Sequence, residues 1–288
     1  MKDKPYLKKY NLAEPDLGEL EKEYLIKAYD SGWISSIGEF VDSFESSFAD
    51  FTNCEFAVSV SNGTVALHLS LVALGIGSGD EVIVPSLTFV ATAASVLHSG
   101  ATPVFIDTEL KTYNIDVDLI EEAITDKTKA IIAVHLYGQP SNMNEINKIA
   151  KKYNLDVIED AAEAHGAKYH GSPVGSMSDV ATFSFYGNKI LTTGEGGMIT
   201  TNNIDLYQKL RFLRDHAMSK EKRYYHTEVG YNYRMTNLQA AIGYGQLSRF
   251  DEIIRRKYKI QKFYDEKFSI LSKYIEPMKK IENVLDVP

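Results

Sequence analysis

The chain has 288 residues, of which 44% are hydrophobic and 24% are charged, a composition typical of a globular protein. Its formal net charge of −8 gives no support to the binding of nucleic acid or of a membrane surface. The single cysteine, Cys54, excludes an intramolecular disulfide and a cysteine-rich zinc site.

The chain begins with a charged segment, MKDKPYLKKYNLAEPD, which lacks the apolar core of a secretory signal. No apolar run approaches the length of a membrane span. We therefore expect a soluble, cytoplasmic protein.

From about residue 55 to residue 201, short apolar strands alternate with amphipathic helices. Strands are predicted at residues 56–60, 81–85, 103–106, 130–134, 156–159, 181–185 and 198–200. Helices are predicted at residues 64–74, 89–98, 119–124 and 143–153. This alternation predicts an α/β fold with a mainly parallel sheet that helices cover on both faces. In such sheets, ligands bind at the carboxyl ends of the strands.

A second unit is expected to begin after the sheet. A helical pattern runs from Asn237 to about Tyr264 and is rich in charge beyond Arg249, as expected of a connector. We predict a large domain at residues 1–248, with an N-terminal arm, and the start of a smaller C-terminal domain at residues 249–288. So short a remainder cannot bury a core of its own, which predicts a truncated second domain.

The most informative segment is ATFSFYGNKILTTGEGG, at residues 181–197. Lys189 follows a buried strand in a backbone loosened by glycines, where its amine is well placed to form a Schiff base with an aldehyde cofactor. A solvated loop lysine is the commoner fate of this residue type. Candidate partners upstream favour the first interpretation.

Two upstream strand ends carry candidate cofactor ligands. Asp160 follows a strand expected at the centre of the sheet, where its carboxylate could balance a protonated pyridine nitrogen or cap the next helix. SNGT, at residues 61–64, lies where a strand turns into a helix, so its N–H groups could bind a phosphate or form an ordinary cap. Phe89 could stack on an aromatic cofactor or belong to the core. Glu163, one helical turn beyond Asp160, could face the same pocket.

Other polar and aromatic residues carry weaker signals. The loop GYNYRM, at residues 230–235, is polar and aromatic, and in a dimer it could enter a neighbour's pocket. His135, His165 and Cys54 show no metal-ligand spacing, so we expect them to serve packing or local hydrogen bonding. No metal site is predicted.

Five segments carry a resemblance to one family: SNGTVALHLSL, GDEVIVPSLTF, VIEDAAEAHGA, FSFYGNK…TTGEGG and GYNYRMTNLQAA. In their order and distances the chain resembles the DegT/DnrJ/EryC1/StrS family of pyridoxal-phosphate-dependent sugar aminotransferases, and within it the GDP-perosamine synthases. The resemblance runs from WISS, at residues 33–36, to about Phe250. It implies a large domain of the aspartate-aminotransferase type (fold type I) with pyridoxal 5′-phosphate as the cofactor.

The resemblance also implies roles for the residues around the cofactor ring. Lys189 would carry the internal aldimine and then act as acid and base. Asp160 would pair with the pyridine nitrogen, and Phe89 would stack on the ring. Glu163 stands where many relatives have a glutamine near the ring hydroxyl.

The cofactor phosphate has its own implied ligands. Gly63, Thr64 and Ser184 would hold it within one chain. Asn232 would reach the phosphate of the neighbouring subunit's cofactor, which implies a homodimer as the active unit.

The implied reaction moves an amino group from an amino acid, expected to be L-glutamate, to a nucleotide-linked 4-keto-6-deoxy sugar for surface polysaccharide (O-antigen of lipopolysaccharide). Two alternatives stay open. Related keto-sugar 3-dehydratases are lyases that carry histidine where Lys189 stands, so the lysine favours a transferase. Family members also continue well past residue 288, which leaves a non-catalytic, cofactor-binding remnant as the third interpretation.

Overall fold

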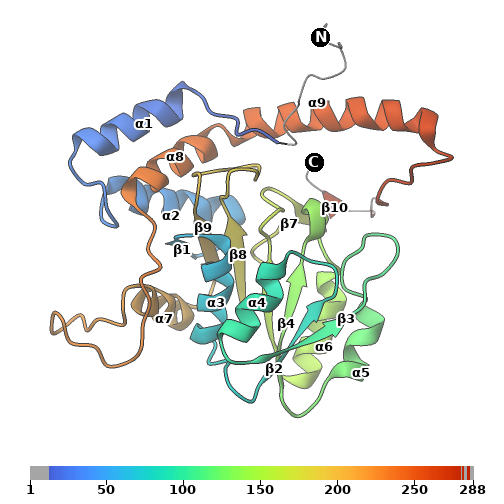
Figure 1. Cartoon of the computed structure of the whole chain (residues 1–288), viewed down its shortest axis with the longest axis horizontal. Helices are drawn as coiled ribbons and strands as arrows, with labels where there is room; N and C mark the ends of the chain where they lie inside the picture. Colours follow the sequence, from blue (N-terminus) through green and yellow to red (C-terminus); the bar gives the residue numbers. More distant parts are fainter. Residues whose placement is uncertain (1–12, 280, 282–283, 286–288) are drawn as a thin grey trace, which may run out of the picture.

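A computed structural model describes residues 13–279, 281 and 284–285, so the start of the expected N-terminal arm lies outside the described residues. Within them, a seven-stranded sheet with the order β1-β9-β8-β5-β4-β2-β3 forms the centre of the molecule (Figure 1). Strand β5, at Asp156–Asp160, is the middle strand of this order. The expected central position of the strand that ends at Asp160 is therefore confirmed.

The other strands of this sheet lie close to the predicted positions. They are β1 (Phe56–Val60), β2 (Glu81–Pro85), β3 (Thr102–Ile106), β4 (Thr128–Val134), β8 (Val180–Ser184) and β9 (Gly197–Thr201). Strands β3, β2, β4, β5 and β8 pair in parallel, which confirms the predicted α/β fold with a mainly parallel sheet. Strand β9 is antiparallel to β8 and β1, because it follows β8 through a loop and not through a crossover helix.

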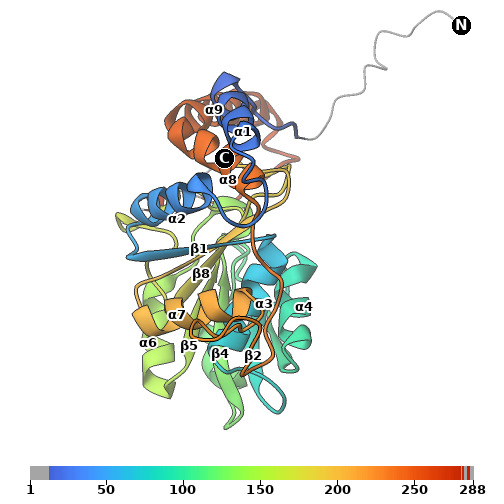
Figure 2. The same cartoon turned by 90° about the vertical axis from the view of Figure 1, so that its left-hand side faces the viewer.

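Helices cover both faces of the sheet (Figure 2). One face packs against α3 (Gly63–Ala73), α4 (Val90–His98) and α7 (Ile204–Arg214). The opposite face packs against α2 (Glu39–Thr52), α5 (Ile120–Ala123), α6 (Met143–Tyr153) and α8 (Asn237–Ser248). Both faces of the sheet are apolar because successive side chains of a strand point to opposite faces. In β2, Val82 and Val84 pack on the α3 side, whereas Ile83 packs on the α6 side.

Two predicted helices differ from the structure. The helix expected at residues 119–124 is a 3-10 turn, Val117–Leu119, followed by the single turn of α5. The long helix expected from Asn237 is two helices, because α8 ends at Ser248 and α9 spans Phe250–Phe268. Between them, the Arg249 guanidinium pairs with the carboxylates of Glu21 and Asp16. These ion pairs join segments far apart in the chain, so the helical periodicity does not reveal the break.

Some elements were not predicted. Helix α1 (Glu19–Asp30) packs against α8, and a small sheet joins β10 (Val284–Leu285), β6 (Lys168–Tyr169) and β7 (Ser172–Pro173). Helix α9 is mostly exposed, with Ile253 as its buried residue. The domain boundary at residues 248/249 remains a prediction. Among the described helices, none combines the length and the apolar character that a membrane span requires.

Candidate active site

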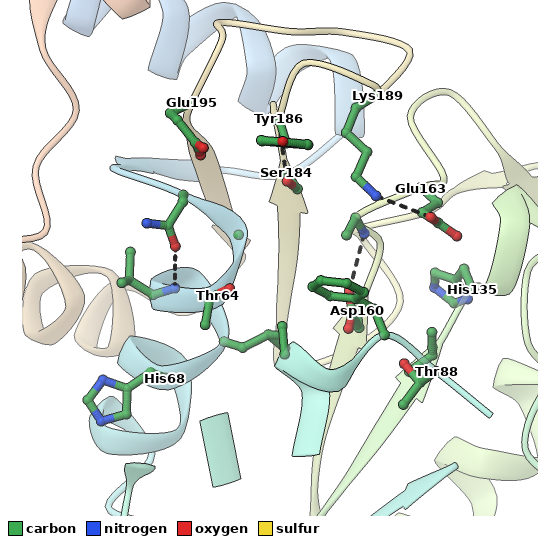
Figure 3. Close-up of a pocket in the computed structure, with 18 of the residues that line it drawn as sticks. Thr64, His68, Thr88, His135, Asp160, Glu163, Ser184, Tyr186, Lys189 and Glu195 are labelled. Carbon is green, nitrogen blue, oxygen red and sulfur yellow. Dashed lines mark hydrogen bonds and ion pairs between the residues drawn. The ribbon is translucent and has the colours of Figure 1, made fainter. Parts of the chain in front are cut away.

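A pocket of about 670 Å³ opens at the carboxyl ends of β4, β5 and β8, beside the first turns of α3 and α4 (Figure 3). It therefore lies at the edge of the sheet where the sequence predicts a ligand. Most of the predicted site residues line it: Gly63, Thr64, Phe89, Asp160, Glu163, Ser184 and Lys189.

Lys189 reaches this pocket from the loop that follows β8. Its backbone N–H donates to the Tyr186 carbonyl at 2.9 Å, and its side chain is 17% exposed. Its Nζ lies 3.1 Å from Glu163 Oε1. Figure 3 marks this ion pair with a dashed line. The other carboxylate oxygen of Glu163 accepts the N–H of Tyr137 at 3.0 Å, so the carboxylate is held from two sides. Lys189 is thus a restrained amine that faces the cavity, not a solvated loop lysine.

Asp160 forms the floor of the pocket at the end of β5. It is 6% exposed, and its Oδ2 accepts the hydroxyl of Thr92 at 2.7 Å. Its Oδ1 accepts the N–H of Ala162 at 3.3 Å. Burial raises the pKa of the Asp160 carboxyl, although these two donors and the nearby charge of Lys189 oppose the rise. No cationic side chain in the described part of the chain pairs directly with this carboxylate. A buried carboxylate of this kind, at the border of a cavity, fits a protonated ring nitrogen as its partner.

The first turn of α3 forms one wall of the pocket. The N-cap Asn62 accepts the Val65 N–H through its side chain. The N–H groups of Gly63 and Thr64 belong to the first turn of α3, where backbone N–H groups have no intrahelical acceptor. A Cβ atom built on Gly63 would lie 2.8 Å from Ser184 Cβ, so glycine is what allows this turn to meet the end of β8. The turn is both an ordinary cap and a cluster of N–H and hydroxyl donors that fits a phosphate.

Phe89 lies at the rim of the pocket. It is the N-cap residue of α4, and it is 74% exposed although it is a large apolar side chain. So large an exposed fraction shows that Phe89 is not a core residue, and it is compatible with stacking of the ring on a flat ligand.

Asn232 is absent from the residues that line the pocket of its own chain. It is exposed, and its side-chain oxygen accepts Arg234 Nη2–H at 3.2 Å. Arg234 in turn pairs with Asp215 at 2.7 Å. The structure of one chain therefore brings Asn232 to the surface and leaves its predicted role untested.

Several residues that line the pocket were not predicted as site residues: Thr88, His68, Glu195 and Tyr233. His68 Nδ1 and the Tyr233 hydroxyl lie 3.1 Å apart, which joins α3 to the segment after residue 230. All four lie in the five segments that carry the family resemblance, and this position is the signal that could have found them. Their residue types alone give no signal, because such residues occur on many helices and loops.

The residues expected to serve packing and local bonding do so. His135 borders the pocket, but its Nε2 contacts Glu159 at 3.0 Å and its Nδ1 accepts the Ser141 N–H. His165 is fully buried, and burial lowers its pKa to about 3. The Cys54 thiol is buried and donates to the Gly175 carbonyl at 3.0 Å.

Comparison with known proteins gives one family. The model of the DegT/DnrJ/EryC1/StrS aminotransferase family matches residues 15–284. The chain is 52% identical to a GDP-perosamine synthase of Caulobacter vibrioides, over 92% of this chain and 71% of that protein. It is 49% identical to a GDP-perosamine synthase of Escherichia coli O157:H7, over 90% of this chain and 71% of the relative.

A solved structure gives the same result for the fold. The PLP form of Spr1654 from Streptococcus pneumoniae, a putative sugar aminotransferase, superposes with a TM-score of 0.89 at 32% identity. The match covers 96% of this chain and 76% of the other. The expected fold type is confirmed by this likeness.

Proposed function

Because the chain belongs to the DegT/DnrJ/EryC1/StrS aminotransferase family, we propose that it transfers an amino group from L-glutamate to a GDP-linked 4-keto-6-deoxy sugar. It is a pyridoxal-phosphate-dependent sugar aminotransferase. The relatives named GDP-perosamine synthase support the choice of sugar nucleotide. The observation that carries the proposal is that Lys189 and Asp160 face one pocket beside the N–H groups of α3.

Each wall of the pocket would hold a different part of the cofactor. When bound, pyridoxal phosphate supplies an aldehyde that captures amines and a protonated ring that withdraws electrons from the attached carbon. The N–H groups of Gly63 and Thr64, with the Ser184 hydroxyl, would bind its phosphate. Phe89 would cover the ring, and Asp160 would keep the ring nitrogen protonated.

Lys189 would perform the proton transfers. Among the described residues that line the pocket, it is the one lysine, so its Nζ is the amine placed to hold the aldehyde. Once released, the same Nζ would carry a proton between the substrate carbon that bears the nitrogen and the cofactor carbon on the other side of that nitrogen, as a general acid and base. The Glu163 carboxylate, 3.1 Å from Nζ, would keep the amine oriented during this step.

The close approach of α3 to β8 makes a testable contribution to cofactor binding. We expect Gly63→Ala to cost about 1–3 kcal/mol of folding free energy, because the new methyl group overpacks against Ser184. We expect the same change to weaken cofactor binding about tenfold, since the phosphate-binding donors separate. Thermal unfolding of the apoprotein and equilibrium dialysis with pyridoxal phosphate measure the two effects.

Gly77→Ala is the matched control, because a Cβ at Gly77 meets its nearest neighbour at an ordinary 3.4 Å. If Gly63→Ala bound the cofactor as tightly as Gly77→Ala does, the proposed phosphate site would be wrong.

We propose further that the active unit is a homodimer in which Asn232 contributes to the neighbouring site. Its exposure outside its own pocket, on a loop held by the Arg234–Asp215 ion pair, supports this role. We expect Asn232→Ala to weaken cofactor binding about tenfold through one lost hydrogen bond to the phosphate. Co-expression of Asn232→Ala chains with Lys189→Ala chains should give mixed dimers with one restored site.

The mixed dimers are to be isolated through different tags on the two chains and assayed beside both parent proteins. The assay uses a cofactor concentration near the wild-type dissociation constant, at which the weakened sites of the Asn232→Ala parent stay mostly empty. Activity of the mixed dimer above that of either parent then supports the shared site. A mixed dimer no more active than the Asn232→Ala parent, or a monomeric wild-type protein, contradicts it.

The reaction itself distinguishes the transferase from its alternatives. Wild-type protein is to be incubated with ¹⁵N-labelled glutamate and a panel of nucleotide-linked 4-keto-6-deoxy sugars, and the products analysed by mass spectrometry. Labelled amino sugar is the expected product. Loss of the sugar 3-hydroxyl without label would identify a dehydratase, and cofactor binding without either product would identify a non-catalytic protein.

We propose that the reaction takes place in the cytoplasm and serves the synthesis of surface polysaccharide such as O-antigen. The single, unpaired Cys54 is compatible with a reducing compartment.

A further inference from the structure

The carboxylate of Asp160 is held by a threonine that the sequence did not single out. Thr92 is fully buried, and its hydroxyl lies 2.7 Å from Asp160 Oδ2. A second threonine is hydrogen-bonded to the first, since the hydroxyl oxygens of Thr88 and Thr92 lie 2.8 Å apart. An ionised carboxylate only accepts hydrogen bonds, so Thr92 donates to Asp160 and accepts from Thr88. The resulting series of hydrogen bonds runs from Thr88, which lines the pocket, through Thr92 to the Asp160 carboxylate.

Thr92 also belongs to the helix turn that carries the exposed aromatic residue. Phe89 is the N-cap of α4, and the Thr92 backbone N–H donates to the Phe89 carbonyl at 3.1 Å. One turn of α4 therefore presents an aromatic ring at the rim and a buried hydroxyl to the floor. The bond from Thr92 to Asp160 connects this turn directly to the end of β5.

We propose that Thr92 is a positioning residue that fixes the Asp160 carboxylate and sets its separation from Phe89. This inference rests on the proposed function, because the gap between Phe89 and Asp160 is where the cofactor ring would lie. The hydroxyl holds Oδ2 while the Ala162 N–H holds Oδ1, so the two donors fix the orientation of a carboxylate that lines the pocket. Because Thr92 is fully buried and is not among the residues that line the pocket, it acts through the carboxylate and not on the ligand.

The hydrogen bond also has an electrostatic consequence. Burial raises the pKa of Asp160, and the Thr92 hydroxyl is the largest influence that opposes this rise. Without the hydroxyl, the pKa of Asp160 rises further, so the carboxylate becomes protonated at a higher pH. The other groups whose charges act on Asp160 are Lys189 and His135, and both are unchanged in the variants described next. A shift in the pH dependence of cofactor binding can therefore be assigned to the lost donor.

The test compares three variants in the binding of pyridoxal phosphate to the apoprotein. Thr92→Val removes the hydroxyl at nearly constant volume, and Thr92→Ser keeps it. Thr52→Val makes the same change at another buried threonine, whose hydroxyl donates to the Phe48 carbonyl away from the pocket. Dissociation constants are to be measured by equilibrium dialysis across the acid and neutral pH range. Thermal unfolding of each apoprotein reports on folding.

For Thr92→Val we expect binding to weaken about 10- to 100-fold, as for the loss of a hydrogen bond to a charged group. Its affinity should also begin to fall at a higher pH than that of the wild type as the solution is made acidic. Thr92→Ser should restore both properties to near the wild-type values, and Thr52→Val should leave both unchanged. These results support the inference.

Two outcomes overturn it. The inference is wrong if Thr92→Val binds the cofactor with the wild-type affinity and pH dependence. It is also wrong if Thr92→Ser is as impaired as Thr92→Val, because the hydroxyl is then not the relevant group. Failure of the proposed function looks different: the wild-type protein itself would not bind pyridoxal phosphate or would not aminate a keto-sugar.

Discussion

Replacement of Lys189 by alanine is expected to lower the turnover number by about 10⁴-fold or more, since one amine both holds the cofactor and carries the proton. The pocket offers no substitute, because no other lysine in the described chain lines it. The measurement is the rate of ¹⁵N transfer from glutamate to the keto-sugar, with the visible absorbance of the cofactor-loaded protein recorded in parallel. We expect the absorbance band of the covalently held cofactor to disappear as well.

The matched control is Lys148→Ala, which removes an exposed lysine that pairs with Glu145 on helix α6. It should retain the wild-type rate and absorbance, because surface ion pairs of this kind contribute little. A Lys189→Ala protein that kept both its absorbance band and its turnover would contradict the assignment of Lys189.

Replacement of Asp160 by asparagine is the second large effect. The change keeps the shape of the side chain and removes its charge, so a buried cationic partner loses its counter-ion. Loss of one member of such a pair costs about 2–5 kcal/mol, which corresponds to a decrease of roughly 30- to several thousand-fold in cofactor affinity. Equilibrium dialysis measures the decrease in cofactor affinity, and the rate of amine transfer measures its effect on the reaction. Asp118→Asn, at an exposed position in the 3-10 turn Val117–Leu119, is the control.

The same substitution should not destabilise the apoprotein at neutral pH. Burial raises the pKa of Asp160 above its unfolded value, so the folded apoprotein holds this proton more tightly than the unfolded chain does. Stability is therefore lost as the pH rises from the unfolded pKa of Asp160 through its raised folded pKa, and above that pH the ionised carboxylate carries the full cost. Asparagine removes that cost. We expect the melting temperature of apo Asp160→Asn at neutral pH to equal or exceed that of the wild type, and a clear decrease would contradict this account of Asp160.

The sequence predicts the sheet and much of the site because both depend on local patterns. Continuous apolar strands predict a parallel sheet, and the carboxyl ends of parallel strands meet at one edge. Asp160 and Lys189 follow such strands, so their convergence could be expected before the structure was known. Phe89 could not be decided in this way, since aromatic residues are common in cores and only its exposure of 74% indicates the rim of a pocket.

Other features depend on contacts that no local pattern encodes. The hydroxyl of Thr92 meets Asp160 across 68 positions of sequence, and a threonine in a first helical turn gives no signal of such a bond. The break between α8 and α9 coincides with ion pairs from Arg249 to Asp16 and Glu21, which lie far away in the sequence. Asn232 is expected to act in a neighbouring chain, so neither its own sequence context nor the structure of one chain places it in a site.

The most direct test of the account is to identify the residue that holds the cofactor. Protein loaded with pyridoxal phosphate is to be reduced with borohydride, digested and analysed by peptide mass spectrometry. We predict a pyridoxyl group on Lys189 and on no other lysine. A label on a different lysine, or tightly bound cofactor that leaves Lys189 unlabelled, would contradict the central claim.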